Sequence, residues 1–137
     1  PAVSRLVNHI ICDRSADSNT PSGAPKLESE CLFCKIISGE IPSTQVYRDE
    51  RVMAFLDITP VAPEHVLVVP LEHLTFLDLV DHSLIGYMAL AGDRIASERG
   101  IRESGFRLTM NQGEDSGQEI DHLHLHITGG HPLGPIA

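Results

Sequence analysis

The sequence contains no tryptophan, few other aromatic residues, and only 10 lysines and arginines against 19 acidic residues. The formal net charge of −9 argues against a general nucleic-acid binder, because the phosphate backbone attracts basic surfaces. No apolar run approaches the roughly 20 residues that a membrane-spanning helix needs. We therefore expect neither nucleic acid nor a membrane as a partner. A single bound nucleotide is still allowed, since backbone N–H groups can hold one phosphate.

The sequence also lacks the even set of cysteines that a secreted disulfide framework would require. Its three cysteines favour a reducing, cytoplasmic location. The 137 residues, 42% of them hydrophobic, suit one domain with a core of its own. Residues 13–28 are mostly polar, with three serines and two prolines, and carry almost nothing that could pack, which is typical of a linker. We expect a flexible N-terminal extension over residues 1–30 and a folded domain over residues 31–137.

Short periodic segments predict an α+β fold, with an antiparallel sheet of about five strands, one long helix, and one or two short helices. Glycine at position 39 should end the first helix. The long helix should begin at Asp81 or Ser83 and end at Gly100. In chain order, the expected short helix is Leu32 to Ser38, and the expected strands are Thr44 to Arg48, Val52 to Leu56, His65 to Val69, Phe106 to Asn111, and His122 to Ile127.

Three histidines alternate with apolar residues in the segment His122-Leu123-His124-Leu125-His126-Ile127. Successive side chains of a strand point to opposite faces, so the imidazoles should share one face and the aliphatic side chains the other. Imidazole can act as base, acid, nucleophile or metal ligand near neutral pH. The segment could be a plain polar-and-apolar strand, a Zn²⁺ or Fe²⁺ site, or a nucleophilic centre.

A loop with two glycines precedes this segment, from Asn111 to Glu119. Glycines allow turns whose successive N–H groups converge on an anion. The loop by itself is a weak signal. Next to an imidazole strand, it suits a phosphate placed against a nucleophile.

These residues together resemble the histidine triad (HIT) family, whose motif is His-x-His-x-His with hydrophobic x. The similarity is to the nucleotide-binding HINT branch in its bacterial form, and it runs from about Cys31 to the C-terminus. The matching positions are Asn111, Gly117-Gln118, His122 to Ile127, Gly129-Gly130, Pro132 to Pro135, Phe55 to Ile58, Pro63, His65, and Val69-Pro70.

The resemblance implies a hydrolase or transferase that cleaves purine nucleoside 5′-phosphoramidates, of the AMP-NH₂, aminoacyl-AMP or lysyl-AMP type. His124 would attack the α-phosphorus and form a nucleotidyl-histidine intermediate, which water would hydrolyse. The backbone carbonyl of His122 would fix the tautomer of His124. His126 would contact the phosphate or the bridging atom, and His65 would complete a histidine network behind the triad. This route requires no catalytic metal.

The resemblance also assigns nucleotide contacts. Asp57 would bind the ribose hydroxyls, Ile58 would pack on the sugar and base, and Asn111 would lie near the sugar-phosphate. Gly117 and the amides of Gln118 and Glu119 would hold phosphate oxygens. Relatives are homodimers joined through the long helix and an adjoining strand, so a homodimer is expected.

One position departs from the family pattern. Glu119 stands where the family usually has a serine, which is thought to contact the phosphate or the leaving group. A carboxylate would repel a phosphate if ionised, or could donate a proton if its pKa were raised. We therefore expect Glu119 to alter leaving-group selectivity.

Cys31 and Cys34 form a Cys-x-x-Cys pair. A redox pair and two unpaired buried thiols are both possible, although no βαβ pattern surrounds them. Several bacterial relatives hold a zinc ion with such a pair, a histidine at the position of His73, and the first triad histidine, here His122. Two thiolates and two imidazoles would form a closed, structural zinc site.

Three functions stay open from the sequence. The first is phosphoramidate hydrolysis through His124, and the second is hydrolysis of dinucleoside polyphosphates. The third is a nucleotide-binding regulator with vestigial catalysis. A metal-dependent hydrolase that uses the triad as ligands is a fourth, weaker reading.

Overall fold

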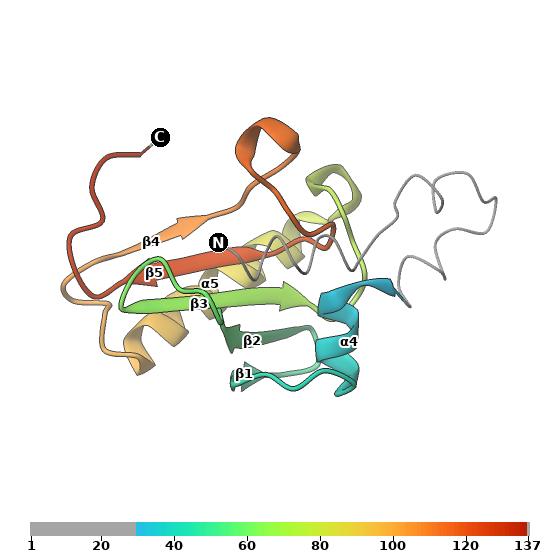
Figure 1. The fold of residues 1–137 in the computed structure, drawn as a ribbon, viewed down its shortest axis with the longest axis horizontal. Coiled ribbons are helices and arrows are strands. Elements are labelled where there is room, and N and C mark those ends of the chain that lie inside the picture. Colours follow the sequence, from blue (N-terminus) through green and yellow to red (C-terminus); the bar gives the residue numbers. More distant parts are fainter. Residues whose placement is uncertain (1–29, 137) are drawn as a thin grey trace.

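The computed structural model describes residues 30–136, which form a five-stranded antiparallel sheet with helices on both faces (Figure 1). The sheet order is β1-β2-β3-β5-β4, so the C-terminal strand lies between β3 and β4. The expected fold class is confirmed. The elements in chain order are α4 (Leu32–Ser38), β1 (Gln45–Arg48), β2 (Val52–Leu56), β3 (Glu64–Pro70), the 3₁₀ turn η1 (Leu77–Leu79), α5 (His82–Glu98), β4 (Phe106–Thr109), the 3₁₀ turn η2 (Glu114–Ser116), and β5 (Leu125–Gly129).

Strand periodicity divides the core between the two faces of the sheet. On one face, Val66 and Val68 of β3 and Ile127 of β5 pack against α5, which lies across the sheet in Figure 1. On the other face, Leu67 and Val69 pack with residues of α4. Because α4 is short, it covers only part of its face. The rest of that face is open to a ligand.

The helix boundaries follow the expected capping residues. Gly39 ends α4 in the left-handed region, with a φ of 89°, and its N–H donates to the carbonyl of Ile36. Asp81 caps α5, because its side chain accepts a hydrogen bond from the backbone N–H of Leu84. The end of α5 is Glu98, two residues before the expected stop at Gly100.

The expectation of one strand over the whole histidine segment is wrong in part. Regular β5 begins only at Leu125. Before it, the N–H of Leu123 donates to the carbonyl of Leu74 at 2.6 Å, and the ring of His124 bonds to the carbonyl of His122. These bonds take the backbone of residues 122–124 out of the ladder. The alternation of faces still holds, since Leu123 and Leu125 lie in the core beside α5.

The expected N-terminal extension lies outside the described residues, apart from Glu30. Within the described residues, no helix has both the length and the apolar character needed to cross a membrane.

Candidate active site

A cavity of about 480 Å³ lies on the sheet face that α4 leaves uncovered. This volume is in the range of small-molecule sites, which run from about 300 to 1,000 Å³. Alternate residues of three adjacent strands supply its floor, because those residues share one face. The cavity is lined by His65 and Leu67 of β3; His124, His126 and Thr128 of the β5 segment; Arg107, Thr109 and Asn111 of the β4 segment; and Phe33, Asp57, Val61, Gly117, Glu119, Ile120, His131 and Leu133.

His124 is buried, and its ring orientation is fixed by the backbone. Its Nδ1 lies 2.7 Å from the carbonyl oxygen of His122. A carbonyl only accepts, so Nδ1 carries the proton and Nε2 keeps a free lone pair. Burial lowers the pKa of His124, which favours the neutral ring. Phe33 of α4 packs edge-on against the same ring, with centroids 5.1 Å apart. The arrangement is that of a nucleophile held with its lone pair available.

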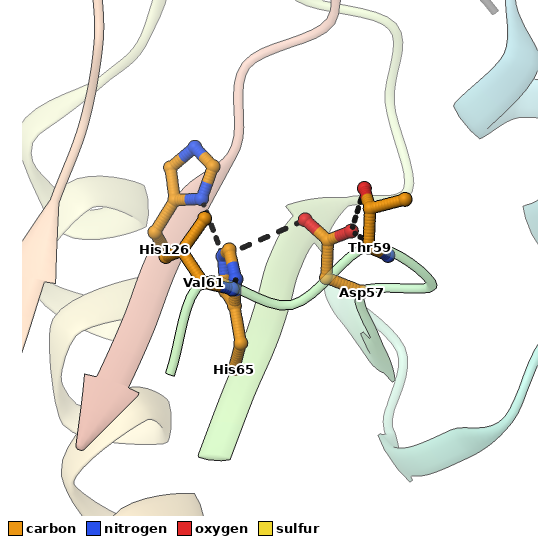
Figure 2. A network of polar contacts seen from close by, with 5 residues as sticks. All are labelled: Asp57, Thr59, Val61, His65 and His126. Atoms are coloured by element: carbon orange, nitrogen blue, oxygen red, sulfur yellow. Dashed lines mark hydrogen bonds and ion pairs between the residues drawn. The ribbon is translucent and has the colours of Figure 1, made fainter. Parts of the chain in front are cut away.

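His65 and His126 form a directed pair, shown in Figure 2. The backbone N–H of Val61 donates to Nδ1 of His65 at 3.2 Å, so the His65 proton must sit on Nε2. That Nε2 lies 2.9 Å from Nδ1 of His126 and donates to it. His126 must then carry its own proton on Nε2. A single backbone amide thus makes His126 a hydrogen-bond donor through its other ring nitrogen.

Both rings of this pair are held neutral. Burial lowers the pKa of His126 to about 3, and the nearby His124 and His65 add to the effect. Burial also lowers the pKa of His65, which the carboxylate of Asp57 partly opposes. The pair therefore offers hydrogen-bonding imidazoles rather than fixed positive charges at neutral pH.

Asp57 lies at the cavity wall just after β2, and a local turn orients its carboxylate (Figure 2). Its Oδ1 accepts from the backbone N–H and the hydroxyl of Thr59, at 2.9 and 3.2 Å. Its Oδ2 lies 3.5 Å from Nε2 of His65. Ile58, which was also predicted to contact the nucleotide, is 71% exposed and does not line the cavity.

The glycine loop borders the cavity, and the amides of Gly117 and Gln118 are engaged within the loop. Gly117 adopts a left-handed conformation with a φ of 85°, and its N–H donates to the carbonyl of Glu114. The N–H of Gln118 donates to the carbonyl of Gly113, and its side chain closes the loop by accepting from the N–H of Gly113 at 2.7 Å. Asn111, Gly117 and Glu119 line the cavity, whereas Gln118 supports the loop from outside. The phosphate contacts predicted for these amides stay a prediction.

The predicted zinc ligands come together, although they lie up to 91 residues apart in the chain. Sγ of Cys31 is 3.4 Å from Nδ1 of His122, and Sγ of Cys34 is 3.2 Å from Nδ1 of His73 and 3.6 Å from Nδ1 of His122. A tetrahedral zinc ion would hold sulfur and nitrogen ligands about 3.6 Å apart. These distances fit.

The protonation pattern of this cluster also fits a metal. Nε2 of His122 donates to the carbonyl of Pro70 at 2.9 Å, which leaves a lone pair on Nδ1 facing the thiols. The pKa of Cys31 is lowered, first by its hydrogen bond with Cys34 and then by His122 and His73, while burial opposes the shift. The cluster thus offers a thiolate at Cys31 and a bare imidazole nitrogen at His122, and its four residues could bind a metal ion.

A second group, Asp57, His65 and His126, is also compact enough to hold a metal. However, the N–H of Val61 directs the His65 proton onto Nε2, the nitrogen that such a metal would need. In the described part of the chain, no such compact group includes all three triad histidines, because His122 faces the thiols. The reading of the triad as one metal site therefore lacks geometric support.

Several cavity residues were missed from the sequence. Arg107 and Thr109 alternate with apolar residues in β4, so the sequence does predict that they share one face of the strand. It does not predict that this face borders the histidines. Val61 contributes through its backbone N–H, for which the sequence holds no signal.

Comparisons with known proteins agree with this site. Residues 38–133 match the HIT domain family model. The chain is 42% identical over 113 residues to the purine nucleoside phosphoramidase of Escherichia coli K12, covering 80% of this chain and 95% of that protein. A solved histidine triad protein from Clostridium difficile has a TM-score of 0.74 and 45% identity, covering 79% of this chain and 96% of that one. A HIT family hydrolase from Clostridium thermocellum has a TM-score of 0.73 and 44% identity, covering 77% of this chain and 95% of that one.

Proposed function

This chain belongs to the HIT domain family, and we propose that it hydrolyses purine nucleoside 5′-phosphoramidates through a nucleotidyl intermediate on His124. The observation that carries the proposal is the ring of His124, which is neutral, buried, and held with Nε2 unprotonated at the cavity. The similarity to the purine nucleoside phosphoramidase of Escherichia coli supports the substrate class.

In the first step, Nε2 of His124 attacks the α-phosphorus, and the P–Nε2 bond forms as the P–N bond to the leaving amine breaks. Because Nδ1–H stays bonded to the carbonyl of His122, the ring does not rotate away from the phosphorus. His126 presents Nε2–H to the phosphoryl group or the bridging nitrogen, where a donor stabilises the charge that develops.

In the second step, water attacks the phosphorus and releases His124 and the nucleoside monophosphate. The leaving nitrogen takes up one proton from solvent in the first step, and the attacking water returns one proton to solvent in the second, so over both steps one water is consumed. His65 acts as a positioning residue, because it fixes the tautomer of His126. Asp57 and Asn111 line the same cavity, where the nucleoside would bind.

The test is to trap the intermediate with adenosine 5′-phosphoramidate by rapid quenching in alkaline denaturant, which preserves a P–N bond, followed by mass spectrometry. We expect one added adenylyl group on the peptide that contains His124. The substitution His124→Ala should abolish the adduct and lower kcat/KM by more than about 10³-fold. The matched control His82→Ala alters a histidine at the exposed start of α5 and should leave both unchanged.

Two other outcomes would replace this proposal. A rate unaffected by His124→Ala would indicate a nucleotide-binding regulator with vestigial catalysis. Faster turnover of diadenosine tetraphosphate than of adenosine phosphoramidate would indicate a dinucleoside polyphosphate hydrolase.

We also propose that Cys31, Cys34, His73 and His122 hold a structural zinc ion. The donor set has two thiols and two imidazoles at suitable distances, and it offers no open position for a substrate. When bound, zinc would tie α4 to the segment that carries the nucleophile. The reaction itself needs no metal step.

A homodimer and a cytoplasmic location complete the proposal. Leu90 of α5 is 74% exposed, Leu108 of β4 is 38% exposed, and β4 is an edge strand of the sheet that residues 30–136 form. An edge strand beside an apolar helix surface is a suitable site for pairing with a second copy. Cys31 and Cys34 are not joined by a disulfide, which suits a reducing compartment.

A further inference from the structure

The carboxylate of Glu119 lies at the cavity, and the proposed mechanism does not use it. Its side chain lines the cavity, yet its Oε2 is buried and has no hydrogen-bond partner among the described residues. Only one other buried side-chain atom in residues 30–136 shares that condition, Nε2 of His73 in the metal cluster. Glu119 is therefore the one unsatisfied acidic group at the cavity.

An unsatisfied carboxylate oxygen is costly in a folded protein. A buried polar group without a partner costs about 1–3 kcal/mol, and more when it is charged. A ligand that brings a donor to this carboxylate removes the cost, and a cationic donor does so best because its hydrogen bond is charge-assisted.

The formal charges of the cavity wall favour the same kind of ligand. Histidines aside, the wall holds two carboxylates, Asp57 and Glu119, against one guanidinium, that of Arg107. Arg107 is partly engaged, since it donates to the carbonyl of Gly134 at 2.7 Å. With a chain net charge of −9, this wall disfavours a polyanion and favours a ligand that carries a positive group.

The two carboxylates come from separate parts of the chain. Asp57 follows β2 and contacts His65 of β3, while Glu119 lies in the connection from β4 to β5. Both line the cavity that contains His124. With the ribose bound at Asp57, Glu119 is the carboxylate of the wall that stays available to the leaving group.

We propose that Glu119 is a specificity-determining residue that selects phosphoramidates whose leaving amine carries a second, cationic group. This inference rests on the proposed function and names its leaving-group class. The carboxylate forms an ion pair with the distal ammonium of the amine and takes no part in bond breaking. The enzyme thereby discriminates among amines by charge.

The test uses two adenosine 5′-phosphoramidates of equal length. One carries 1,3-diaminopropane, which ends in an ammonium, and the other carries n-butylamine, which ends in a methyl group. We expect the wild type to prefer the cationic substrate in kcat/KM. Glu119→Gln should lower the ratio of the two values by about tenfold, the loss of one partly buried ion pair. Comparing ratios cancels the different basicities of the two amines.

Two further variants define the controls. Glu114→Gln removes the same charge from the exposed turn η2 of the same loop, outside the cavity, and should keep the wild-type ratio. Glu119→Asp keeps the charge and should keep most of the preference. A ratio in Glu119→Gln within about twofold of the wild type would overturn the inference.

Binding separates this inference from the proposed function. In His124→Ala, calorimetric affinities for the same two compounds can be measured without turnover. If the wild type hydrolysed neither compound, the proposed function would fail. The role of Glu119 would still be supported if His124→Ala bound the cationic compound more tightly and the double variant His124→Ala/Glu119→Gln did not. Equal affinities for both compounds in His124→Ala would contradict it.

Discussion

Single backbone groups determine what the histidines of this site can do. The carbonyl of Pro70 accepts a hydrogen bond from Nε2–H of His122, and the carbonyl of His122 accepts one from Nδ1–H of His124. The amide of Val61 forces the proton of His65 onto the opposite nitrogen. Three imidazoles in one small region therefore differ in role: His122 faces the two cysteines, His124 offers a lone pair to the cavity, and His65 donates to His126.

The lowered pKa of His126 predicts an acid-sensitive stability. Its folded pKa of about 3 lies below the ordinary value of 6.5, so the unfolded chain binds more protons below about pH 6.5. The free energy of unfolding should therefore fall as the pH drops from 7 to 5. In His126→Asn, that loss should be smaller by about 1 kcal/mol.

Urea unfolding at pH 7 and pH 5 measures this difference. The exposed His82 provides the control, since His82→Asn should keep the wild-type pH dependence. An equal loss in His126→Asn and the wild type would show that His126 is not held neutral by the fold.

At the scale of elements, the helix α4 depends on distant partners. It has only seven residues, too few for stability in isolation. Phe33 packs against Phe55 of β2, and Cys31 and Cys34 reach His73 and His122. The cluster of two cysteines and two histidines therefore connects the start of α4 to the histidine segment.

Loss of the proposed zinc ion should destabilise the protein and release α4. We expect about one zinc per chain in the wild type by mass spectrometric metal analysis, and much less in Cys31→Ser. The melting temperature of Cys31→Ser should fall by at least about 5 °C. The third cysteine, Cys12, lies outside the described residues, and Cys12→Ser serves as the matched control with unchanged zinc. Wild-type protein free of zinc after purification without chelators would contradict the proposal.

A second connection between elements is made by Asp49 in the turn between β1 and β2. Its carboxylate accepts from the hydroxyls of Tyr47 and Tyr87, and from the backbone amides of Arg51 and Val52. Because Tyr87 belongs to α5, this carboxylate links the hairpin to the long helix. Although burial alone would raise the pKa of Asp49, the hydrogen bonds from the two tyrosines and the amides lower it to about 2.

Replacing this carboxylate should weaken the link. Asp49→Asn should lower the free energy of unfolding by about 2 kcal/mol at pH 7, because several bonds to a charged acceptor are lost. Since the folded pKa is lowered, the stabilisation is present above about pH 4 and disappears as the pH falls through about 2. Asp115→Asn, in the exposed turn η2, removes the same charge and should have little effect. Equal stability of Asp49→Asn and the wild type at pH 7 would refute the link.

At the scale of the whole molecule, the exposed apolar surface of α5 predicts self-association. Leu90→Glu introduces a charge at its most exposed leucine and should convert a dimer to a monomer in light scattering at micromolar concentration. Leu79→Glu changes an exposed leucine of η1 and should leave the dimer intact. A wild-type protein that is monomeric at the same concentration would contradict the prediction.

The fold followed closely from the sequence because most of its elements have local signals. Val52–Leu56 and Leu32–Ser38 match the expected ranges, and strand periodicity placed the imidazoles opposite the aliphatic residues. The error over residues 122–124 arose because a long-range bond from Leu123 to Leu74 and a local bond from the ring of His124 to the carbonyl of His122 replace the ladder there. Periodicity cannot distinguish a strand from an extended segment bonded elsewhere.

The sequence by itself determined the chemistry available: an alternating histidine segment, a Cys-x-x-Cys pair, and an acid at position 119. Residue type and the two-residue period of an extended chain are local properties, so they can be read without coordinates. Only the tertiary structure decided which atoms meet. It brought Val61 to His65, both cysteines to His122, and Glu119 to the cavity with one oxygen unsatisfied. The contacts of the cysteines with His122 span about 90 residues, and the short Val61–His65 contact depends on the exact path of a loop, so no periodic pattern encodes either of them.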